Sequence, residues 1–222
     1  MKIAVFAKNI SSWIAKHSKL ITPKRQPFIY VALGDSTVEG IGASSPEKTY
    51  AGLIHKHLLT IKKQTQFYNL GQAFATTQVV IHLQLSKALS LKPDLITISV
   101  GPNDLREKTS AKIFRYQLRT LLTTIKKQTS AEIIINTIPD FSMSKAIPRW
   151  QRTLSRVLIP RMNKIIKEEA KEVNAVVVDL YSASKIYWGN PDIISEDGFH
   201  PSDLGYTIWA DTIIKEMKHL LE

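Results

Sequence analysis

The sequence predicts an α/β fold, a three-layer α/β/α sandwich built on about five parallel strands. The first observation is a set of short runs rich in Ile and Val, which polar residues hardly interrupt. Such runs are typical of parallel strands that are covered on both faces. The second observation is that amphipathic helical segments alternate with these runs. This alternation predicts right-handed βαβ units and a doubly wound sheet.

The predicted elements follow one another without a repeat or an interdomain linker, and 222 residues suit a single α/β domain. Strands are expected at 28–33, 66–70, 95–100, 133–138 and 175–180, of which 66–70 is the weakest. Helices are expected at 50–61, 76–90, 114–125, roughly 161–172, and 210–221, where apolar residues recur with helical spacing. We therefore expect a flavodoxin-like sandwich over residues 27–222, with its ligand site at the carboxyl ends of the strands.

Residues 1–26 form a basic arm ahead of this domain. Six of the 30 Lys and Arg residues lie in the first 25 positions, which carry no Asp or Glu. Phe6, Ile10 and Trp13 fall near one face of a helix, with the lysines mostly elsewhere. The arm is therefore interpreted either as an extra helix packed on the domain or as an amphipathic helix on an anionic membrane surface. Its short apolar run does not favour a cleavable signal, and no stretch approaches the length of a transmembrane helix.

Composition narrows the function classes. The chain has no cysteine, which excludes disulfides, thiolate nucleophiles and zinc–cysteine sites. His55 and His57 face different sides of a predicted helix, and no phosphate loop or dinucleotide fingerprint occurs. We therefore expect neither a cofactor nor a metal. A nucleic-acid partner is not expected either, because the basic residues lack aromatic interleaving and a recognised module. The expected location is the cytoplasm, with association to a membrane as the alternative.

Polar side chains follow the predicted strands at the edge where ligands bind in such sheets. Ser36 comes after the first strand, behind a glycine that allows a sharp turn. Asn103 follows strand 95–100, where its amide can donate to a developing oxyanion. Asp197 and His200 lie three positions apart in a late loop, so the carboxylate can hold one imidazole nitrogen while the other faces a serine. Each of these features alone is more typical of a turn, a helix cap or a solvated loop.

Together, the order of these segments and their flanks resemble the SGNH (GDSL-type) hydrolase family. Residues 32–43 are similar to the first block of the family, with Thr37 where a leucine often stands. Residues 99–104 are similar to its Gly-x-Asn-Asp block, and residues 197–206 to its last block. The likeness covers about residues 28–215 and leaves the arm out. The resemblance implies a catalytic triad in which Ser36 is the nucleophile, His200 the base and Asp197 the residue that orients the base.

One position departs from the family pattern. The second block of the family usually reads Asn-x-Gly-x-x-Gly; Asn69 and Gly71 match it, but Phe74 stands at the last glycine. The resemblance implies that the backbone N–H groups of Phe74 and Ser36 and the side chain of Asn103 stabilise the oxyanion. If the glycine serves because φ is positive, phenylalanine is strained there. Its ring is then expected to narrow or line the substrate site.

The function implied by the resemblance is hydrolysis of carboxylic esters or thioesters of small to medium acyl groups through an acyl-enzyme. The partner is then a small-molecule ester. One alternative is a carbohydrate O-deacetylase with the same machinery. Another is a catalytically impaired binding protein, an alternative raised by Phe74. Retention of Ser36, Asn103, Asp197 and His200 together argues against a binding protein.

Overall fold

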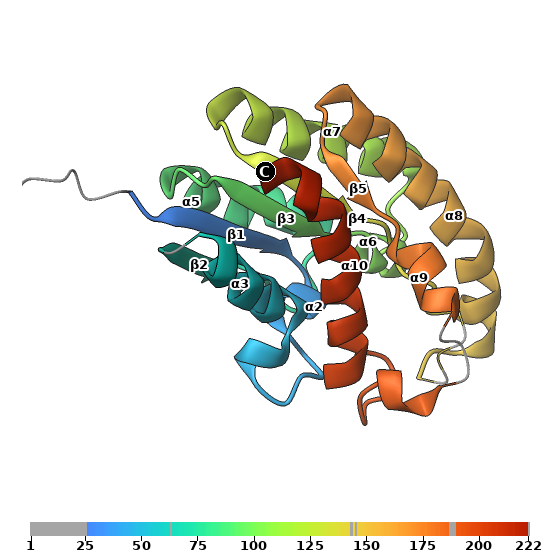
Figure 1. Cartoon of the computed structure of the whole chain (residues 1–222). Coiled ribbons are helices and arrows are strands. Elements are labelled where there is room, and N and C mark those ends of the chain that lie inside the picture. Colours follow the sequence, from blue (N-terminus) through green and yellow to red (C-terminus); the bar gives the residue numbers. More distant parts are fainter. Residues whose placement is uncertain (1–25, 63, 143, 145, 187–189, 222) are drawn as a thin grey trace, which may run out of the picture.

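The computed structural model describes residues 26–62, 64–142, 144, 146–186 and 190–221, and it contains a five-stranded parallel sheet (Figure 1). The strands are β1 (Phe28–Gly34), β2 (Thr65–Asn69), β3 (Leu95–Ser99), β4 (Glu132–Asn136) and β5 (Val176–Val178). Their order is β2-β1-β3-β4-β5, with every pairing parallel. This is the flavodoxin-like order, so the predicted fold class is confirmed.

Helices cover both faces of the sheet (Figure 1). The α-helices are α2 (Ser36–Glu39), α3 (Tyr50–Ile61), α4 (Thr77–Val79), α5 (Leu85–Ser90), α6 (Pro102–Arg106), α7 (Ala111–Gln128), α8 (Arg149–Glu172), α9 (Leu180–Ile186) and α10 (Asp203–Leu221). Short 3₁₀-helices span Pro46–Lys48 and Pro191–Ile193, and a π-helical segment spans Val80–Gln84. The predicted helix at 76–90 is therefore divided into α4, the π-helical segment and α5.

Two hydrophobic cores flank the sheet because successive strand residues point to opposite faces. Val31 and Leu33 of β1 belong to the core that α5, α7 and α8 cover. Tyr30 and Ala32 belong to the core that α3 and α10 cover. The strands β1, β3 and β4 are thus buried on both sides, which is why they read as continuous apolar runs in the sequence, whereas β2 has no fully buried residue.

Helix α8 is longer than the predicted helix at 161–172, which is the second half of a helix that begins at Arg149. The predicted helix begins directly after Pro160, a residue that lacks an N–H and commonly interrupts the helical hydrogen-bond pattern. In the structure Pro160 is exposed, while Ile159 and Met162 on either side of it are buried against the core. Their burial holds the helix together across the proline. The first half of α8 extends beyond the carboxyl edge of the sheet (Figure 1).

The strand predicted at 175–180 ends two residues earlier in the structure. β5 stops at Val178 because the Asp179 carboxylate accepts a hydrogen bond from the backbone N–H of Ser182 at 3.0 Å. Asp179 thereby caps the start of α9, and Leu180 belongs to that helix. The ends of the other strands agree with the predictions to within two residues.

The predicted arm falls on residues 1–25, outside the described part of the chain, apart from Gln26. Its contact with a membrane therefore stays a prediction, as does the cytoplasmic location. Within the described residues, no helix combines the length and the apolar character needed to cross a bilayer.

Candidate active site

The turn that carries Ser36 lies at the carboxyl end of β1. Gly34 there has a φ of +146°, and a Cβ on it would lie 2.0 Å from the carbonyl oxygen of Ser99. Only glycine therefore lets the end of β1 lie this close to β3. The Asp35 carboxylate accepts hydrogen bonds from the backbone N–H and the hydroxyl of Thr37, at 2.9 and 2.8 Å. Asp35 thus caps α2 at the helix turn that begins with Ser36, which is a structural role.

A buried glutamine holds the same turn from the other side. The Gln84 carboxamide accepts from the backbone N–H of Gly34 at 2.9 Å and donates to its carbonyl at 2.8 Å. Gln84 ends the π-helical segment, a kind of distortion that is frequent at functional sites. Gln84 was not predicted from the sequence as a site residue. The feature that could have indicated it is a glutamine among the apolar positions of the predicted helix at 76–90.

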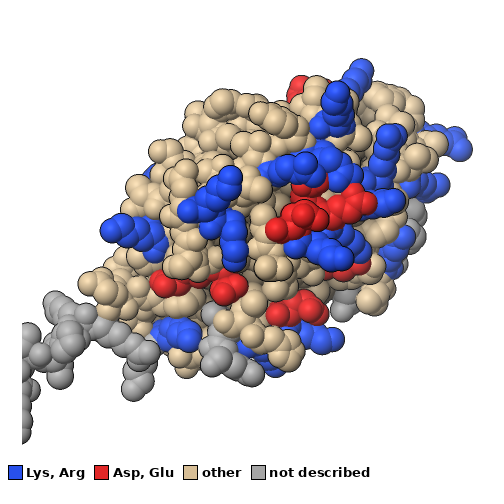
Figure 2. Space-filling view, turned by 90° about the horizontal axis from the view of Figure 1, so that it is seen from above, with Lys and Arg blue, Asp and Glu red and all other residues tan. Residues whose placement is uncertain are grey.

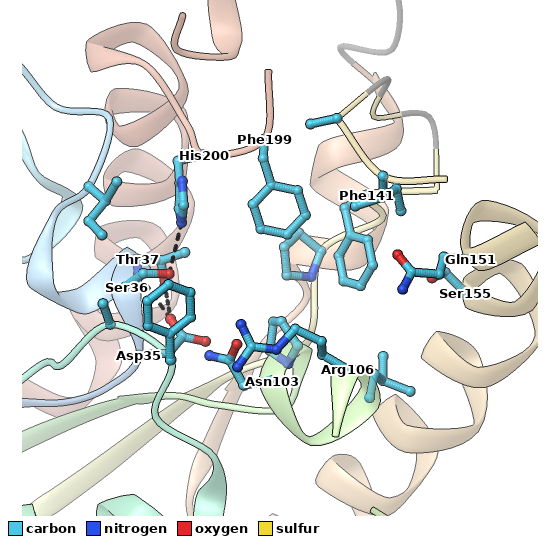
Figure 3. A pocket seen from close by; sticks show the side chains of 18 of the residues that line it. Asp35, Ser36, Thr37, Asn103, Arg106, Phe141, Gln151, Ser155, Phe199 and His200 are labelled. Carbon is cyan, nitrogen blue, oxygen red and sulfur yellow. Dashed lines mark hydrogen bonds between the residues drawn. The ribbon is translucent and has the colours of Figure 1, made fainter. Parts of the chain in front are cut away.

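Asp197 and His200 lie in the loop that leads to α10. Oδ1 of Asp197 accepts hydrogen bonds from the Ser195 hydroxyl and from the backbone N–H groups of Phe199 and His200, at 2.8–2.9 Å. Oδ2 lies 2.5 Å from Nδ1 of His200. Nε2 of His200 in turn lies 2.9 Å from the hydroxyl oxygen of Ser36 (Figure 3). The structure therefore joins the three predicted residues in one hydrogen-bonded chain.

The carboxylate in this chain is held in its charged form. Partial burial raises the pKa of Asp197, but hydrogen bonds from the His200 side chain and from the loop outweigh it. The pKa of Asp197 is consequently well below its ordinary value. An ionised Asp197 accepts from Nδ1–H of His200, which leaves Nε2 free to accept the Ser36 proton. The ring of Phe199 packs against the His200 ring edge-on, at 5.1 Å between centroids.

Hydrogen-bond donors gather on the other side of Ser36. Nδ2 of Asn103, near the start of α6, donates to the Ala75 carbonyl at 3.1 Å, and the carboxamide has a second N–H. The backbone N–H groups of Ser36 and Phe74 donate to no acceptor within the described part of the chain. Asn103 is oriented toward the region of Ser36 in Figure 3. All three predicted oxyanion donors therefore have an N–H without a protein partner.

Phe74 has a φ of +64°, so the condition under which phenylalanine is strained at this position holds in the structure. Its side chain is 67% exposed. The guanidinium carbon of Arg106 lies 4.8 Å from the centre of the ring, a cation–π contact. The ring lines the pocket beside Ser36 and does not fill it.

A pocket of about 390 Å³ opens at Ser36 and runs toward α8 (Figure 3). Phe141 and Phe199, whose ring centroids lie 5.6 Å apart, form its middle, and α8 forms its far wall. The lining is mostly apolar: Ile41, Ala73, Phe74, Pro102, Leu105, Pro139, Phe141, Ala146, Ile147, Trp150, Leu154, Leu158, Phe199, Pro201 and Trp209. This surface can accept an apolar group next to the serine.

A second buried acid is Asp104, which follows the predicted oxyanion donor Asn103 in the sequence. Oδ2 of Asp104 accepts from the backbone N–H and the hydroxyl of Thr77, both at 3.0 Å, while Oδ1 is buried without a partner. Burial raises the pKa of Asp104 to about 6, against the opposing effect of the Thr77 hydrogen bonds. Burial likewise raises the pKa of Asp35 to about 6. Asp104 connects α6, which carries Asn103, to the segment that follows Phe74.

Two histidines away from Ser36, His55 and His82, have structural surroundings. Nε2 of His55 lies 3.4 Å from the Thr65 carbonyl, and its ring stacks on Phe67. His82 contacts Gln78, one turn before it in the chain. Among the residues that the structure describes, no three His, Asp or Glu side chains are grouped as metal ligands.

SGNH-type hydrolases have an α/β/α sandwich with a parallel sheet, and the carboxyl edge of that sheet carries a hydrogen-bonded Ser–His–Asp triad. Residues 32–208 match the profile of the GDSL-like lipase/acylhydrolase family, and the chain belongs to this family. The predicted family and class of enzyme are thus confirmed.

The chain is 24% identical over 192 residues to a GDSL-like esterase of Mycobacterium tuberculosis, and it spans 61% of the length of that protein. The structure is similar to a lipase/acylhydrolase from Enterococcus faecalis, with a TM-score of 0.72, 26% identity and coverage of 88% of this chain and 97% of that one. An acetyl xylan esterase from Geobacillus stearothermophilus shares the fold, with a TM-score of 0.68, 20% identity and coverage of 86% and 94%.

Proposed function

We propose that this protein hydrolyses carboxylic esters or thioesters of small to medium acyl groups through an acyl-enzyme. The observation that carries the proposal is the 2.9 Å contact between Nε2 of His200 and the Ser36 hydroxyl, at the mouth of an apolar pocket. A serine hydroxyl is a weak nucleophile until a base removes its proton. His200, oriented by Asp197, is that base in the proposal.

In the first step the Ser36 oxygen attacks the carbonyl carbon of the ester while Nε2 of His200 takes the hydroxyl proton. The carbonyl oxygen then carries the negative charge of a tetrahedral intermediate. When the intermediate collapses, the bond to the leaving alcohol or thiol breaks, and His200 gives its proton to the leaving group. Water then attacks the acyl-enzyme by the same route, which releases the acid and restores Ser36.

The oxyanion is stabilised in this proposal by the N–H groups of Ser36, Phe74 and Asn103. Each of these three residues has an N–H group that donates to no acceptor in the described part of the chain, and this supports the assignment. These donors are already in position before the reaction, and they interact most strongly with the charge that develops in the transition state. They therefore lower the activation barrier in addition to strengthening substrate binding. Because a backbone N–H survives substitution, Phe74 supplies this donor as glycine would.

The apolar lining favours an acyl chain over a sugar in the pocket, since a buried sugar hydroxyl without a hydrogen-bond partner is costly. Carbohydrate deacetylation is the second candidate, because acetyl xylan esterases have the same fold. The complete Ser36–His200–Asp197 chain argues against an impaired binding protein.

Labelling by a fluorophosphonate tests for an activated serine, with Ser36→Ala as the unlabelled control. A panel of p-nitrophenyl esters from acetate to laurate, together with acetylated sugars, then identifies the acyl group. We expect Ser36→Ala and His200→Ala each to abolish turnover without loss of fold. Activity within tenfold of wild type in either variant would contradict the triad, and preferential turnover of acetylated sugars would favour the second candidate.

A further inference from the structure

The first half of α8, residues 149–160, forms an overhang beyond the sheet (Figure 1). From Ile159 onward the helix is regularly buried against the core, whereas Ser155 is the buried residue before that point. The inner face of the overhang, which includes Gln151 and Ser155, lines the pocket (Figure 3). The overhang is therefore a wall of the pocket, and the sheet does not support it from behind.

An apolar stripe runs along the exposed side of the overhang. Trp150, Leu154 and Val157 are 59%, 46% and 68% exposed, and their spacing places them on one side of the helix. Trp150 and Leu154 also line the pocket, so the stripe is continuous with the pocket mouth. Exposed apolar groups that are contiguous in this way mark interaction sites more often than isolated ones do.

All charged side chains of the overhang are positive. Residues 149–160 contain Arg149, Arg152 and Arg156 and no acid. The acids of α8 lie in its second half, where Glu168 and Glu169 form ion pairs with arginines of α7. Figure 2, which looks down on α7 and α8, shows Lys and Arg widely spread and the acids confined to a few groups.

The pocket lining also includes two basic residues outside α8. They are Arg106 and Lys108. Glu107 lies between them in the sequence, and its carboxylate is bound to Arg106 at 3.0 Å. The pocket is thus lined by Lys108 and the ion-paired Arg106 in addition to a helix that combines exposed apolar residues with arginines.

We propose that the overhang docks the pocket mouth onto an anionic lipid bilayer, so that esters dissolved in the bilayer reach Ser36 without crossing water. Apolar side chains enter the boundary of the bilayer, and arginines contact its negative headgroups. A basic, partly apolar surface that leads into an apolar pocket matches this partner better than an acidic protein, which would leave the pocket mouth facing a polar surface. The docking goes beyond the proposed hydrolysis, and it is measured without catalysis.

The test is co-sedimentation of the full-length Ser36→Ala protein with phosphatidylcholine vesicles that contain or lack phosphatidylglycerol. We expect binding only to the anionic vesicles, weakened by salt. Arg149→Gln is expected to lower the vesicle affinity about fivefold, the contribution of one basic residue near such a surface. Val157→Ser is expected to lower it as well. Leu83→Ser removes a leucine that is 62% exposed outside the overhang, so it is the matched control and should bind like the parent.

Two further measurements make the test decisive. Arg149 and Val157 do not line the pocket, so these changes in the otherwise wild-type enzyme should leave turnover of a soluble p-nitrophenyl ester unchanged, which also shows that the variants fold. Lys16→Gln with Lys19→Gln tests the basic arm as the source of binding. No binding to anionic vesicles, or binding that only the arm variant weakens, would overturn the proposal.

Discussion

Replacing Phe74 by glycine and by alanine separates the cost of a left-handed backbone from the loss of the ring. Both changes remove the same ring and its contact with Arg106. Only alanine keeps the Cβ that makes a φ of +64° unfavourable. Comparison of the two variants therefore isolates the conformational effect at the position where this chain departs from its family.

The structure sets the magnitudes. With 67% of the side chain exposed, about one third of the full burial energy is lost, roughly 0.5–1 kcal/mol. Loss of the exposed cation–π contact costs about 0.5–1 kcal/mol more. A left-handed alanine carries about 1–2 kcal/mol of strain. Glycine avoids this strain but loses roughly 0.5–1 kcal/mol through the entropy of the unfolded chain. We expect wild type to be the most stable, and Phe74→Gly to exceed Phe74→Ala by about 0.5–1 kcal/mol.

Urea unfolding of the three proteins measures these differences, with the slopes compared to verify that the transitions are alike. Ester turnover is measured in parallel, and both variants should remain active because each keeps the backbone N–H. An alanine variant as stable as the glycine variant, or more stable, would show that the backbone at position 74 is not left-handed in solution. Loss of activity in both variants would instead assign the ring itself a role in catalysis.

Three further outcomes are expected. Asn103→Ala should lower kcat by about 10²–10³ with little change in KM, because an oxyanion bond forms fully only in the transition state; steady-state kinetics in which KM alone changes would make Asn103 a substrate-binding residue. Gln84→Leu leaves the backbone N–H of Gly34 without its acceptor, while the Gly34 carbonyl keeps the hydrogen bond from the Gln72 backbone N–H, so the change should cost roughly 1–3 kcal/mol in urea unfolding; an unchanged stability would show that water replaces the lost bonds. For Asp104, burial raises the folded-state pKa from 3.8 to about 6, so its protonation stabilises the fold fully below about pH 4, and this contribution is lost as the pH rises through 6. Relative to Asp104→Asn, wild type should therefore lose up to about 3 kcal/mol between pH 4 and 7, and a constant difference across that range would contradict the raised pKa.

The fold was predictable because the strands β1, β3 and β4 are covered on both faces. Complete burial requires unbroken apolar runs, and runs such as 95–100 are visible without any knowledge of long-range contacts. The proximity of Ser36, Asp197 and His200 was predictable because their segments occur in the order of the SGNH family blocks and each follows a predicted strand or precedes a predicted helix. The hydrogen bonds join three residues that the family resemblance had grouped and that spacing alone would not have identified.

Other features depend on contacts that sequence spacing does not encode. Gln84 reaches Gly34 across 50 positions of the chain, and helical periodicity contains no information about such a partner. Helix α8 continues through Pro160 because buried residues on both sides hold it to the core, whereas the local rule for proline ends the helix there. The left-handed backbone of Phe74 followed from the family pattern, but the contact of its ring with Arg106 did not.

Because the sheet does not support the first half of α8, the residues that shape this wall of the pocket are separate from the residues that stabilise the fold. The hydrogen bonds that join Ser36, His200 and Asp197 belong to a turn after β1 and a loop before α10, whereas the far wall of the pocket belongs to a segment outside both cores. Changes in the length or side chains of residues 149–158 can therefore reshape the pocket while the sheet and the Ser36–His200 contact stay intact. A protein of this design can acquire new substrates by exchange of one helical segment, and libraries confined to that segment are a direct way to redirect it.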